Sequence, residues 1–390
     1  FSFFFFLWII MFYIEGLYSL HTTRLKSLPI SLLRALGLSV LVSVIFFYLF
    51  PYERITPKRN LIIIAGISLL LNWSWHTIFR NITTASKFLI RVTLLGDNQT
   101  VSLVQKELQR KPYLGFLVVR VLDHIDALTI EETDLIVVGR QLMNDPKVGN
   151  RLLQILGQHK SVMELGNFFE MVSGKIPLNE VNETWFLDAC GIQTSKSYQL
   201  IKNSFDKSIA LVLLVLIIPL YAFLVPLLLI VSGRPIFFGQ IRTGHLNRPF
   251  RIWKLRTMIV NAEKDGAQWA KPGDARVTTV GKFLRMTRLD ELPQLWNIIT
   301  GDMSIVGPRP ERPEMIESML APNIPFYEQR HLVRPGVTGW AQVNFRYGFS
   351  TDDSLEKLQY DLYYVKNQSL WLDLRILLKT IKIVLTGAGQ

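Results

Sequence analysis

The sequence predicts a membrane protein of the α/β class. We expect N-terminal transmembrane helices, a Rossmann-like parallel α/β domain, and a monotopic domain with a proline-broken re-entrant membrane helix and interfacial helices. The 390 residues are 49% hydrophobic yet carry a net charge of +12, which indicates a membrane protein whose soluble face meets anions. Strand and helix patterns alternate over residues 91–190, and residues 209–231 form an uncharged run that contains prolines.

Residues 1–80 hold the predicted transmembrane helices. Leu28–Phe50 and Leu61–Phe79 each have about the length of a membrane-spanning helix. Phe1–Ile14 is apolar but shorter than a span, and we expect it to be the end of a helix in a sequence truncated at its N-terminus. If each span crosses the membrane once, the residues after Arg80 lie on the same side of the membrane as Arg24 in the first loop. We take that side as cytoplasmic. These helices also offer a surface for a homodimer.

The Rossmann-like domain is predicted from alternating strands and helices. The turn after its first strand, Gly96–Gln99, lacks the GxGxxG fingerprint of a dinucleotide site, which favours a regulatory or scaffolding role over nucleotide binding. A nucleotide-sugar dehydratase or epimerase would also need a Tyr-xxx-Lys pair, and residues 91–190 contain none. The predicted elements are Arg91–Leu95 (strand), Thr100–Arg110 (helix), Phe116–Leu122 (strand) and Leu135–Val138 (strand).

Residues 196–390 form the third predicted domain, which opens with the apolar run 209–231. Basic residues flank this run on both sides, so a simple crossing does not satisfy the positive-inside rule. A re-entrant helix that breaks at Pro219 and returns to the same face does satisfy it. The alternative is an ordinary kinked transmembrane helix. The flanking basic residues are Lys196, Lys202, Lys207, Arg234, Arg242, Arg248, Arg251, Lys254 and Arg256.

The basic run after the apolar segment has two interpretations. Arg234, Arg248 and Arg251 suit a juxtamembrane patch that binds anionic membrane lipids. Lys254 and Arg256 alternate along a predicted short strand, Ile252–Met258, and would share one face of it. We interpret these two as part of a phosphate-binding wall.

Arg285–Pro310 contains two adjacent carboxylates, Asp290 and Glu291. On a helix their side chains would point about 100° apart. That geometry favours separate roles for the two carboxylates, one as a nucleophile and the other as a metal ligand. Pro293 is tolerated in the first turn of a helix, so we expect Asp290 at a helix N-terminus. Arg309 stands between two prolines and is suited to grip phosphate. The alternative is that both acids merely cap a helix and match its dipole.

The C-terminal part continues with a second proline-glycine turn that carries Arg334. Ser354–Lys366 predicts an amphipathic helix, and Trp371–Thr386 predicts a helix that lies on the membrane surface. Cys190 is the single cysteine, which excludes an internal disulfide.

From about Ser204 to Gln390 the chain resembles the polyprenyl-phosphate hexose-1-phosphate transferases, which are monotopic phosphoglycosyl transferases of the bacterial sugar transferase family. The N-terminal half is similar to the long members of this family, which place membrane helices and a Rossmann-like domain first. The motifs that carry the resemblance are Phe205-Asp206, GQIRTG at 239–244, WKLRTM at 253–258, LDELPQLWN at 289–297, GDMSIVGPRP at 301–310 and RPGVTGWAQVN at 334–344.

The resemblance implies a ping-pong reaction. Asp290 would attack the β-phosphorus of a UDP-sugar, release UMP and hold the sugar phosphate, and undecaprenyl phosphate would then accept it. Glu291 matches the ligand of a Mg²⁺ ion. The further residues assigned to substrate phosphate or nucleotide are Arg309, Arg285, Lys254, Arg256 and Arg334.

Lys202 and Asp206, near the start of the re-entrant helix, are interpreted as structural or lipid-phosphate contacts. The resemblance places the enzyme in the bacterial inner membrane with its catalytic domain on the cytoplasmic face. It implies the first membrane step of exopolysaccharide, capsule or O-antigen synthesis, with glucose or galactose as the expected sugar and N-acetylated or deoxyamino sugars left open. A scaffold protein with a silent catalytic part is the rival class, and the intact pair of acids argues against it. We expect no nucleic-acid binding, because no recognition motif is present.

Overall fold

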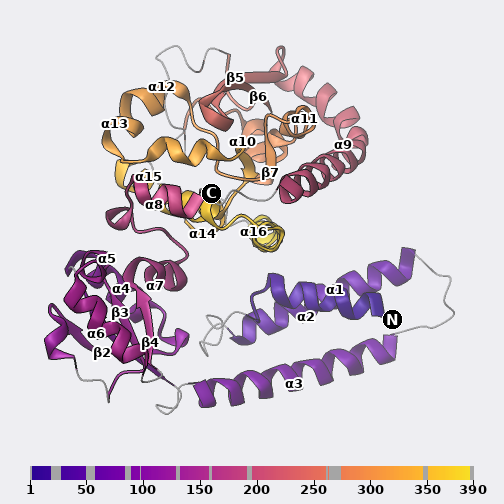
Figure 1. Cartoon of the computed structure of the whole chain (residues 1–390). Helices are drawn as coiled ribbons and strands as arrows, with labels where there is room; N and C mark the ends of the chain where they lie inside the picture. The colour runs from indigo at the N-terminus through magenta and orange to yellow at the C-terminus, as the bar shows by residue number, and fades with distance from the viewer. Residues whose placement is uncertain are drawn as a thin grey trace. The chain divides into compact units, whose positions relative to one another are not determined.

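A computed structural model of the chain describes residues 2–18, 28–49, 58–83, 89–96, 98–128, 132–157, 160–190, 196–260, 262, 274–345 and 350–386. The first loop, on which the predicted cytoplasmic side depends, lies outside these residues, as does Asp97 of the predicted Gly96–Gln99 turn. The chain divides into two compact units, Phe1–Glu180 and Val181–Gln390, which Figure 1 shows in indigo-to-purple and magenta-to-yellow.

The first unit begins with apolar helices, α1 (Ser2–Ile14), α2 (Leu28–Leu49) and α3 (Lys58–Thr83). Two of them contain segments long and apolar enough to cross a membrane, Pro29–Tyr48 and Asn60–Phe79, as the sequence predicts. Trp8 of α1 packs against Leu32 of α2, and its Nε1 donates a hydrogen bond to Ser43 Oγ (3.0 Å). This bond satisfies the one polar atom of a buried indole. A homodimer through these helices stays a prediction.

A four-stranded parallel sheet follows, with the strand order β2-β1-β3-β4. Helices α4 and α7 cover one face and α6 covers the other. The predicted parallel α/β sheet is therefore confirmed. Strand β4 was not predicted, because it is short and only half-buried and so lacks a continuous apolar run. The elements are β1 (Ile90–Leu95), α4 (Asn98–Arg110), β2 (Phe116–Leu122), β3 (Leu135–Val138), α5 (Arg140–Met143), α6 (Pro146–Leu156), β4 (Ser161–Glu164) and α7 (Leu165–Ser173).

The second unit places short elements around an antiparallel hairpin, β5–β6, and a parallel strand pair, β7–β8. Residues 181–190, which the sequence suggested as the end of the Rossmann-like domain, belong to this unit, and most of them form α8. The elements are α8 (Glu183–Cys190), α9 (Lys196–Ser232), β5 (Phe237–Thr243), β6 (Pro249–Leu255), α10 (Thr279–Thr287), α11 (Gln294–Thr300), β7 (Ser304–Val306), α12 (Pro313–Met315), α13 (Ala321–Asn323), β8 (Gly336–Thr338), α14 (Trp340–Asn344), α15 (Thr351–Lys366) and α16 (Leu370–Thr386).

Helix α9 is long and apolar enough to cross a membrane. It continues through Pro219 and Pro226, so Pro219 does not end the helix. Proline removes a helical hydrogen bond and bends a helix without having to end it, and Figure 1 shows α9 bent. Its first half packs on β6 and α11 through Ala210, and its second half packs on Leu255 and Leu284 through Leu224 and Leu228. The re-entrant path of α9 stays a prediction.

The last two helices form at the predicted places. Ser350 and Asp353 make a capping box at the start of α15. Helix α16 buries Leu372 and Ile376 against α14 and α15, while it exposes Trp371 and other apolar side chains. An exposed apolar face of this kind fits the predicted position on a membrane surface, which stays a prediction.

Candidate active site

Asp290 and Glu291 lie in a 3-10 turn, η7 (Leu289–Glu291), between α10 and α11. Arg288 ends α10 with φ at 59°, which turns the chain sharply before the two acids. Asp290 therefore lies within a short 3-10 turn and not at the N-terminus of α11, which begins at Gln294. The expectation that placed Pro293 in the first turn of that helix is wrong, because Pro293 comes just before it. Asp290 is buried with 7% exposed, and Glu291 is largely covered with 10% of its side chain exposed.

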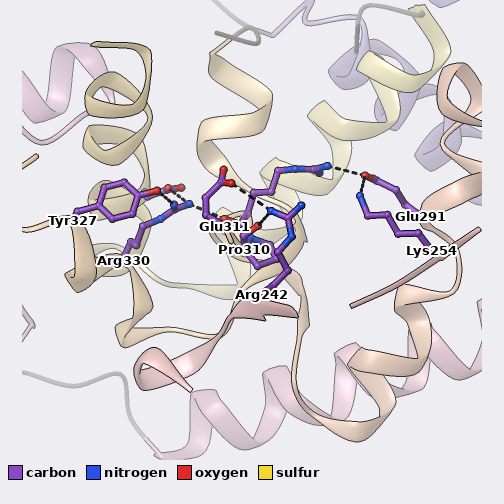
Figure 2. A network of polar contacts seen from close by, with 9 residues as sticks. Arg242, Lys254, Glu291, Pro310, Glu311, Tyr327 and Arg330 are labelled. Atoms are coloured by element: carbon purple, nitrogen blue, oxygen red, sulfur yellow. Dashed lines mark hydrogen bonds and ion pairs between the residues drawn. The ribbon is translucent and has the colours of Figure 1, made fainter. Parts of the chain in front are cut away.

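Three cations surround the Glu291 carboxylate. Its Oε1 accepts hydrogen bonds from Arg309 Nη2 (2.8 Å) and Lys254 Nζ (3.2 Å), and its Oε2 lies 3.6 Å from Arg288 Nη1. Figure 2 shows Lys254 and Glu291 at one end of a polar network. Burial raises the pKa of Glu291, but the charges of Arg309, Lys254 and Arg288 outweigh it and hold the pKa well below its usual range. Glu291 is therefore an ionised group at neutral pH.

Asp290 has the opposite environment. Its Oδ1 is buried and has no hydrogen-bond partner within the described residues. Burial, and then the negative charge of Glu291, raise the pKa of Asp290 to about 6, although the charges of Lys254, Arg285 and Arg288 oppose this rise. The unpaired carboxylate oxygen of Asp290, with its raised basicity, is suited to attack an electrophile. The ionised, paired carboxylate of Glu291 is instead suited to bind a positively charged group. The two adjacent acids thus differ as the sequence suggested.

The other predicted phosphate contacts divide into two groups. We call Asp290 and Glu291 together the dyad. Lys254 donates a hydrogen bond to Glu291 of the dyad. The charge of Arg285 acts on Asp290, while its Nε donates to Thr257 Oγ1 (2.9 Å). Arg256 instead donates to the carbonyl oxygens of Ser232 and Gly233 and so caps the C-terminal end of α9.

One expectation about this group needs correction. The predicted strand Ile252–Met258 is present as far as Leu255, where β6 ends, so the strand alternation that would put Arg256 beside Lys254 stops there. Arg334 donates to Asn203 Oδ1 on α9, and no contact of Arg334 or Arg256 with either acid occurs in the part of the chain that the structure describes. Their role at the substrate phosphate or nucleotide stays a prediction.

Lys202 and Asp206 belong to a buried polar cluster between α9, β7 and α16. Lys202 Nζ lies 2.7 Å from Asp373 Oδ2 and 3.9 Å from Asp206 Oδ2. Ser304 Oγ donates to Asp206 Oδ2 (2.5 Å), and the hydroxyl of Tyr364 donates to Asp373 Oδ1 (2.8 Å). Of the two roles suggested by the sequence, these contacts favour the structural one.

Two arginines of the site were not predicted as functional. Arg242 Nη1 donates to the carbonyl oxygen of Pro310 (3.1 Å), and Arg330 Nη2 donates to that of Arg309 (2.8 Å). Figure 2 shows Tyr327 and Arg330 at one end of this network, Arg242 beside Pro310 and Glu311 in its middle, and Lys254 and Glu291 at the other end. Arg309 joins the two ends, because its carbonyl oxygen accepts from Arg330 and its Nη2 donates to Glu291. Arg242 stands in the GQIRTG motif, which was a usable signal, whereas Arg330 stands in no motif.

Two hollows adjoin the dyad. The first is an apolar pocket of about 460 Å³ between the middle of α9, the β5–β6 hairpin and the residues that follow Glu291. The second is a small basic hollow that includes Arg242, Lys254, Arg309 and Gln294, whose Nε2 is buried without a partner in the described part of the chain. The apolar pocket is lined by Leu214, Ile217, Ile218, Tyr221, Phe237, Trp253, Leu292, Pro293, Leu295 and Trp296.

The dyad could hold a Mg²⁺ ion only together with water and substrate phosphate, not as a cage made of protein ligands alone. Within the described residues no three His, Cys, Asp or Glu side chains gather as a metal cage. Mg²⁺, however, commonly uses one or two carboxylates together with waters and substrate phosphates. The ionised Glu291, with the unpaired Oδ1 of Asp290 next to it, meets that smaller requirement.

Comparison with known proteins gives a consistent result. Residues 197–387 match the family described as bacterial sugar transferase. The chain is 36% identical over 352 residues to the UDP-N-acetylgalactosamine-undecaprenyl-phosphate N-acetylgalactosaminephosphotransferase of Aeromonas hydrophila, covering 90% of this chain and 78% of that protein. It is 33% and 30% identical to the UDP-glucose:undecaprenyl-phosphate glucose-1-phosphate transferases of Klebsiella pneumoniae and Escherichia coli K12. These matches cover 64% and 74% of this chain, and 54% and 66% of those proteins.

Proposed function

Because this chain belongs to the bacterial sugar transferase family, we propose that it transfers a sugar 1-phosphate from a UDP-sugar to undecaprenyl phosphate and releases UMP. The names of the relatives support this reaction class. They differ in the sugar, which is N-acetylgalactosamine in the Aeromonas hydrophila relative and glucose in the other two. The donor is thus to be sought among UDP-glucose, UDP-galactose and UDP-N-acetylgalactosamine.

The observation that carries the proposal is the unequal environment of Asp290 and Glu291. In the first step an Asp290 carboxylate oxygen attacks the β-phosphorus of the UDP-sugar, the bond from that phosphorus to the bridging oxygen breaks, and UMP leaves with the electron pair. In the second step a phosphate oxygen of the lipid attacks the same phosphorus and Asp290 leaves as a carboxylate. The unpaired, buried Oδ1 of Asp290 supports its role as nucleophile.

The cations around Glu291 would bind the donor diphosphate. Lys254 and Arg309 line the basic hollow together with Arg242, and each can donate to phosphate oxygens when a diphosphate replaces Glu291 as partner. Glu291 would hold Mg²⁺, which when bound neutralises part of the diphosphate charge. Arg285 would add a further positive charge at Asp290.

The apolar pocket supports the place of the lipid acceptor. Its wall continues from Leu292 and Pro293, directly after the dyad, to the apolar middle of α9. A polyprenyl chain whose phosphate meets Asp290 can therefore lie in this pocket and pass on into the bilayer. Its volume of about 460 Å³ is within the usual range for a small-molecule site and would hold the first isoprene units.

The contacts of α9 support a re-entrant path. Near its start Lys202 pairs with Asp373, and at its end Ser232 accepts from Arg256, so both ends are tied to the same compact unit. A helix that crossed the bilayer would carry its two ends to opposite faces, about 30 Å apart. We propose that α9 returns to the face it entered, the cytoplasmic face of the inner membrane, where Asp290 meets both a soluble donor and a lipid phosphate.

The covalent intermediate gives the direct test. Full-length protein in nanodiscs is incubated with each UDP-sugar and Mg²⁺ without lipid acceptor, then digested and analysed by mass spectrometry. The proposal expects a sugar-phosphate adduct on the peptide that contains Asp290, lost on adding undecaprenyl phosphate and absent in Asp290→Asn. An adduct on another residue, or lipid-dependent turnover by Asp290→Asn, would contradict it.

A further inference from the structure

The turn that carries Arg309 is fixed from outside at four consecutive carbonyl oxygens, those of residues 308–311. Pro308 and Pro310 have no N–H group, so the turn cannot use those positions to form its own backbone bonds. The donors to the four oxygens are, in order, Gly336 N (2.9 Å), Arg330 Nη2 (2.8 Å), Arg242 Nη1 (3.1 Å) and Thr243 N (2.9 Å). Two of these anchors are side chains, and the backbone of Arg309 itself depends on Arg330.

Arg330 is buried and held by a buried acid. Only 6% of its side chain and 2% of the Asp361 side chain are exposed, and Arg330 Nη2 lies 2.7 Å from Asp361 Oδ2. Arg330 Nη1 also donates to the hydroxyl of Tyr327. Figure 2 shows Tyr327 and Arg330 at the end of the network opposite Glu291. A side chain so deeply covered does not reach substrate, and its hydrogen bond to the Arg309 carbonyl is its direct link to the candidate site.

A buried ion pair is by itself weak evidence of a stabilising role, because well-packed apolar residues often replace such a pair without loss of stability. An apolar replacement cannot, however, donate a hydrogen bond to the Arg309 carbonyl. We propose that the Arg330–Asp361 pair is a positioning device: it orients the Arg330 guanidinium, which fixes the backbone of Arg309 so that its own guanidinium meets Glu291 and the donor diphosphate. The part that concerns the diphosphate rests on the proposed function.

Arg242 anchors the next carbonyl of the turn but does not provide a clean test. It lines the basic hollow and pairs with Glu311 (3.4 Å), so its removal would alter the diphosphate site directly. Arg330 and Asp361 come from η9 (Tyr327–Leu332) and α15 and belong to neither hollow. A change at this pair therefore isolates positioning from binding.

The test compares full-length protein in nanodiscs with the double variant Arg330→Met/Asp361→Leu, which keeps the volume of the pair and removes the donor. The control is Arg91→Met/Asp134→Leu, which removes a different Arg–Asp ion pair, a more exposed one in the first unit. Three quantities are measured: the affinity for UDP as an unreactive fragment of the donor, the KM values for UDP-sugar and undecaprenyl phosphate, and the unfolding temperature.

We expect the double variant to unfold near the wild-type temperature, to bind UDP about 10- to 100-fold more weakly and to raise the KM for UDP-sugar alike, with an unchanged KM for the lipid. The control should match wild type. Wild-type UDP affinity in the folded double variant would overturn the proposal.

If that variant does not fold, the single variant Asp361→Asn provides the test: weaker UDP binding supports the proposal and wild-type binding overturns it. Weaker UDP binding together with a wild type that transfers no phosphosugar would uphold the positioning role and reject the transferase.

Discussion

Gly336 provides a sharp test of how tightly the arginine turn must be held. A Cβ at Gly336 would lie 2.1 Å from Gly307 N and 2.5 Å from Thr338 O, whereas real Cβ contacts essentially never fall below 3.0 Å. Gly336→Ala must therefore push β8 and the turn after β7 apart by about 1 Å, at a cost of about 1–3 kcal/mol. A misplacement of about 1 Å at a catalytic group can cost about a hundredfold in rate. Because Gly307 leads directly into the turn of Arg309, we expect that loss in kcat/KM.

The assay is UMP release in nanodiscs with saturating lipid, beside an unfolding curve for each variant. Gly149→Ala is the control, since its Cβ would meet nothing nearer than 3.9 Å in α6. We expect Gly149→Ala to keep wild-type activity and to gain a few tenths of a kcal/mol or more in stability. A folded Gly336→Ala protein with kcat/KM within threefold of wild type would refute the reasoning that the backbone crossing sets the position of Arg309.

Three further predictions follow from the site. Since Asp290 must be ionised to attack and burial raises its pKa to about 6, kcat/KM should be full at pH 7 and fall as the pH drops through about 6; a flat profile down to pH 5 would count against this role. Lys254→Met should move that fall to higher pH, because the Lys254 charge lowers the pKa of Asp290, and an unmoved or lower midpoint would speak against the coupling. Trp296→Ala should raise the KM for undecaprenyl phosphate and leave the KM for UDP-sugar unchanged, since Trp296 lines only the apolar pocket; the reverse pattern would place the lipid elsewhere.

The elements with strong local patterns could be predicted from the sequence. The apolar runs predicted as 28–50 and 61–79 correspond to α2 and α3, and the first three strands appear at the predicted positions, β1 with one extra residue. These elements are long or continuously apolar, so their pattern is visible without tertiary context. Strand β4 is short and partly exposed, and such a strand depends on the neighbour that it pairs with.

In the candidate site too, the sequence predicted residues that stand in local motifs but not contacts that arise only from tertiary packing. Asp290, Glu291, Lys254 and Arg309 could be chosen because their motifs place acids and cations in constrained turns, and the structure brings all four together. The partners of Arg256 were beyond such reasoning, because it donates to backbone carbonyls more than 20 residues away, and any residue can supply a carbonyl. Arg330 is a similar case, since its contact with the Arg309 carbonyl exists only once η9 packs beside the turn.

The most direct test of the central claim is UMP release by full-length protein in nanodiscs with Mg²⁺, measured over a panel of UDP-sugars with and without undecaprenyl phosphate. Asp290→Asn and Glu291→Gln run beside the wild type. The account predicts sustained UMP release from one sugar only when the lipid is present, with a single turnover per enzyme in its absence, and both abolished in Asp290→Asn. No release from any sugar by folded wild type, or undiminished release by Asp290→Asn, would contradict the assignment of Asp290 as the nucleophile of a phosphosugar transferase.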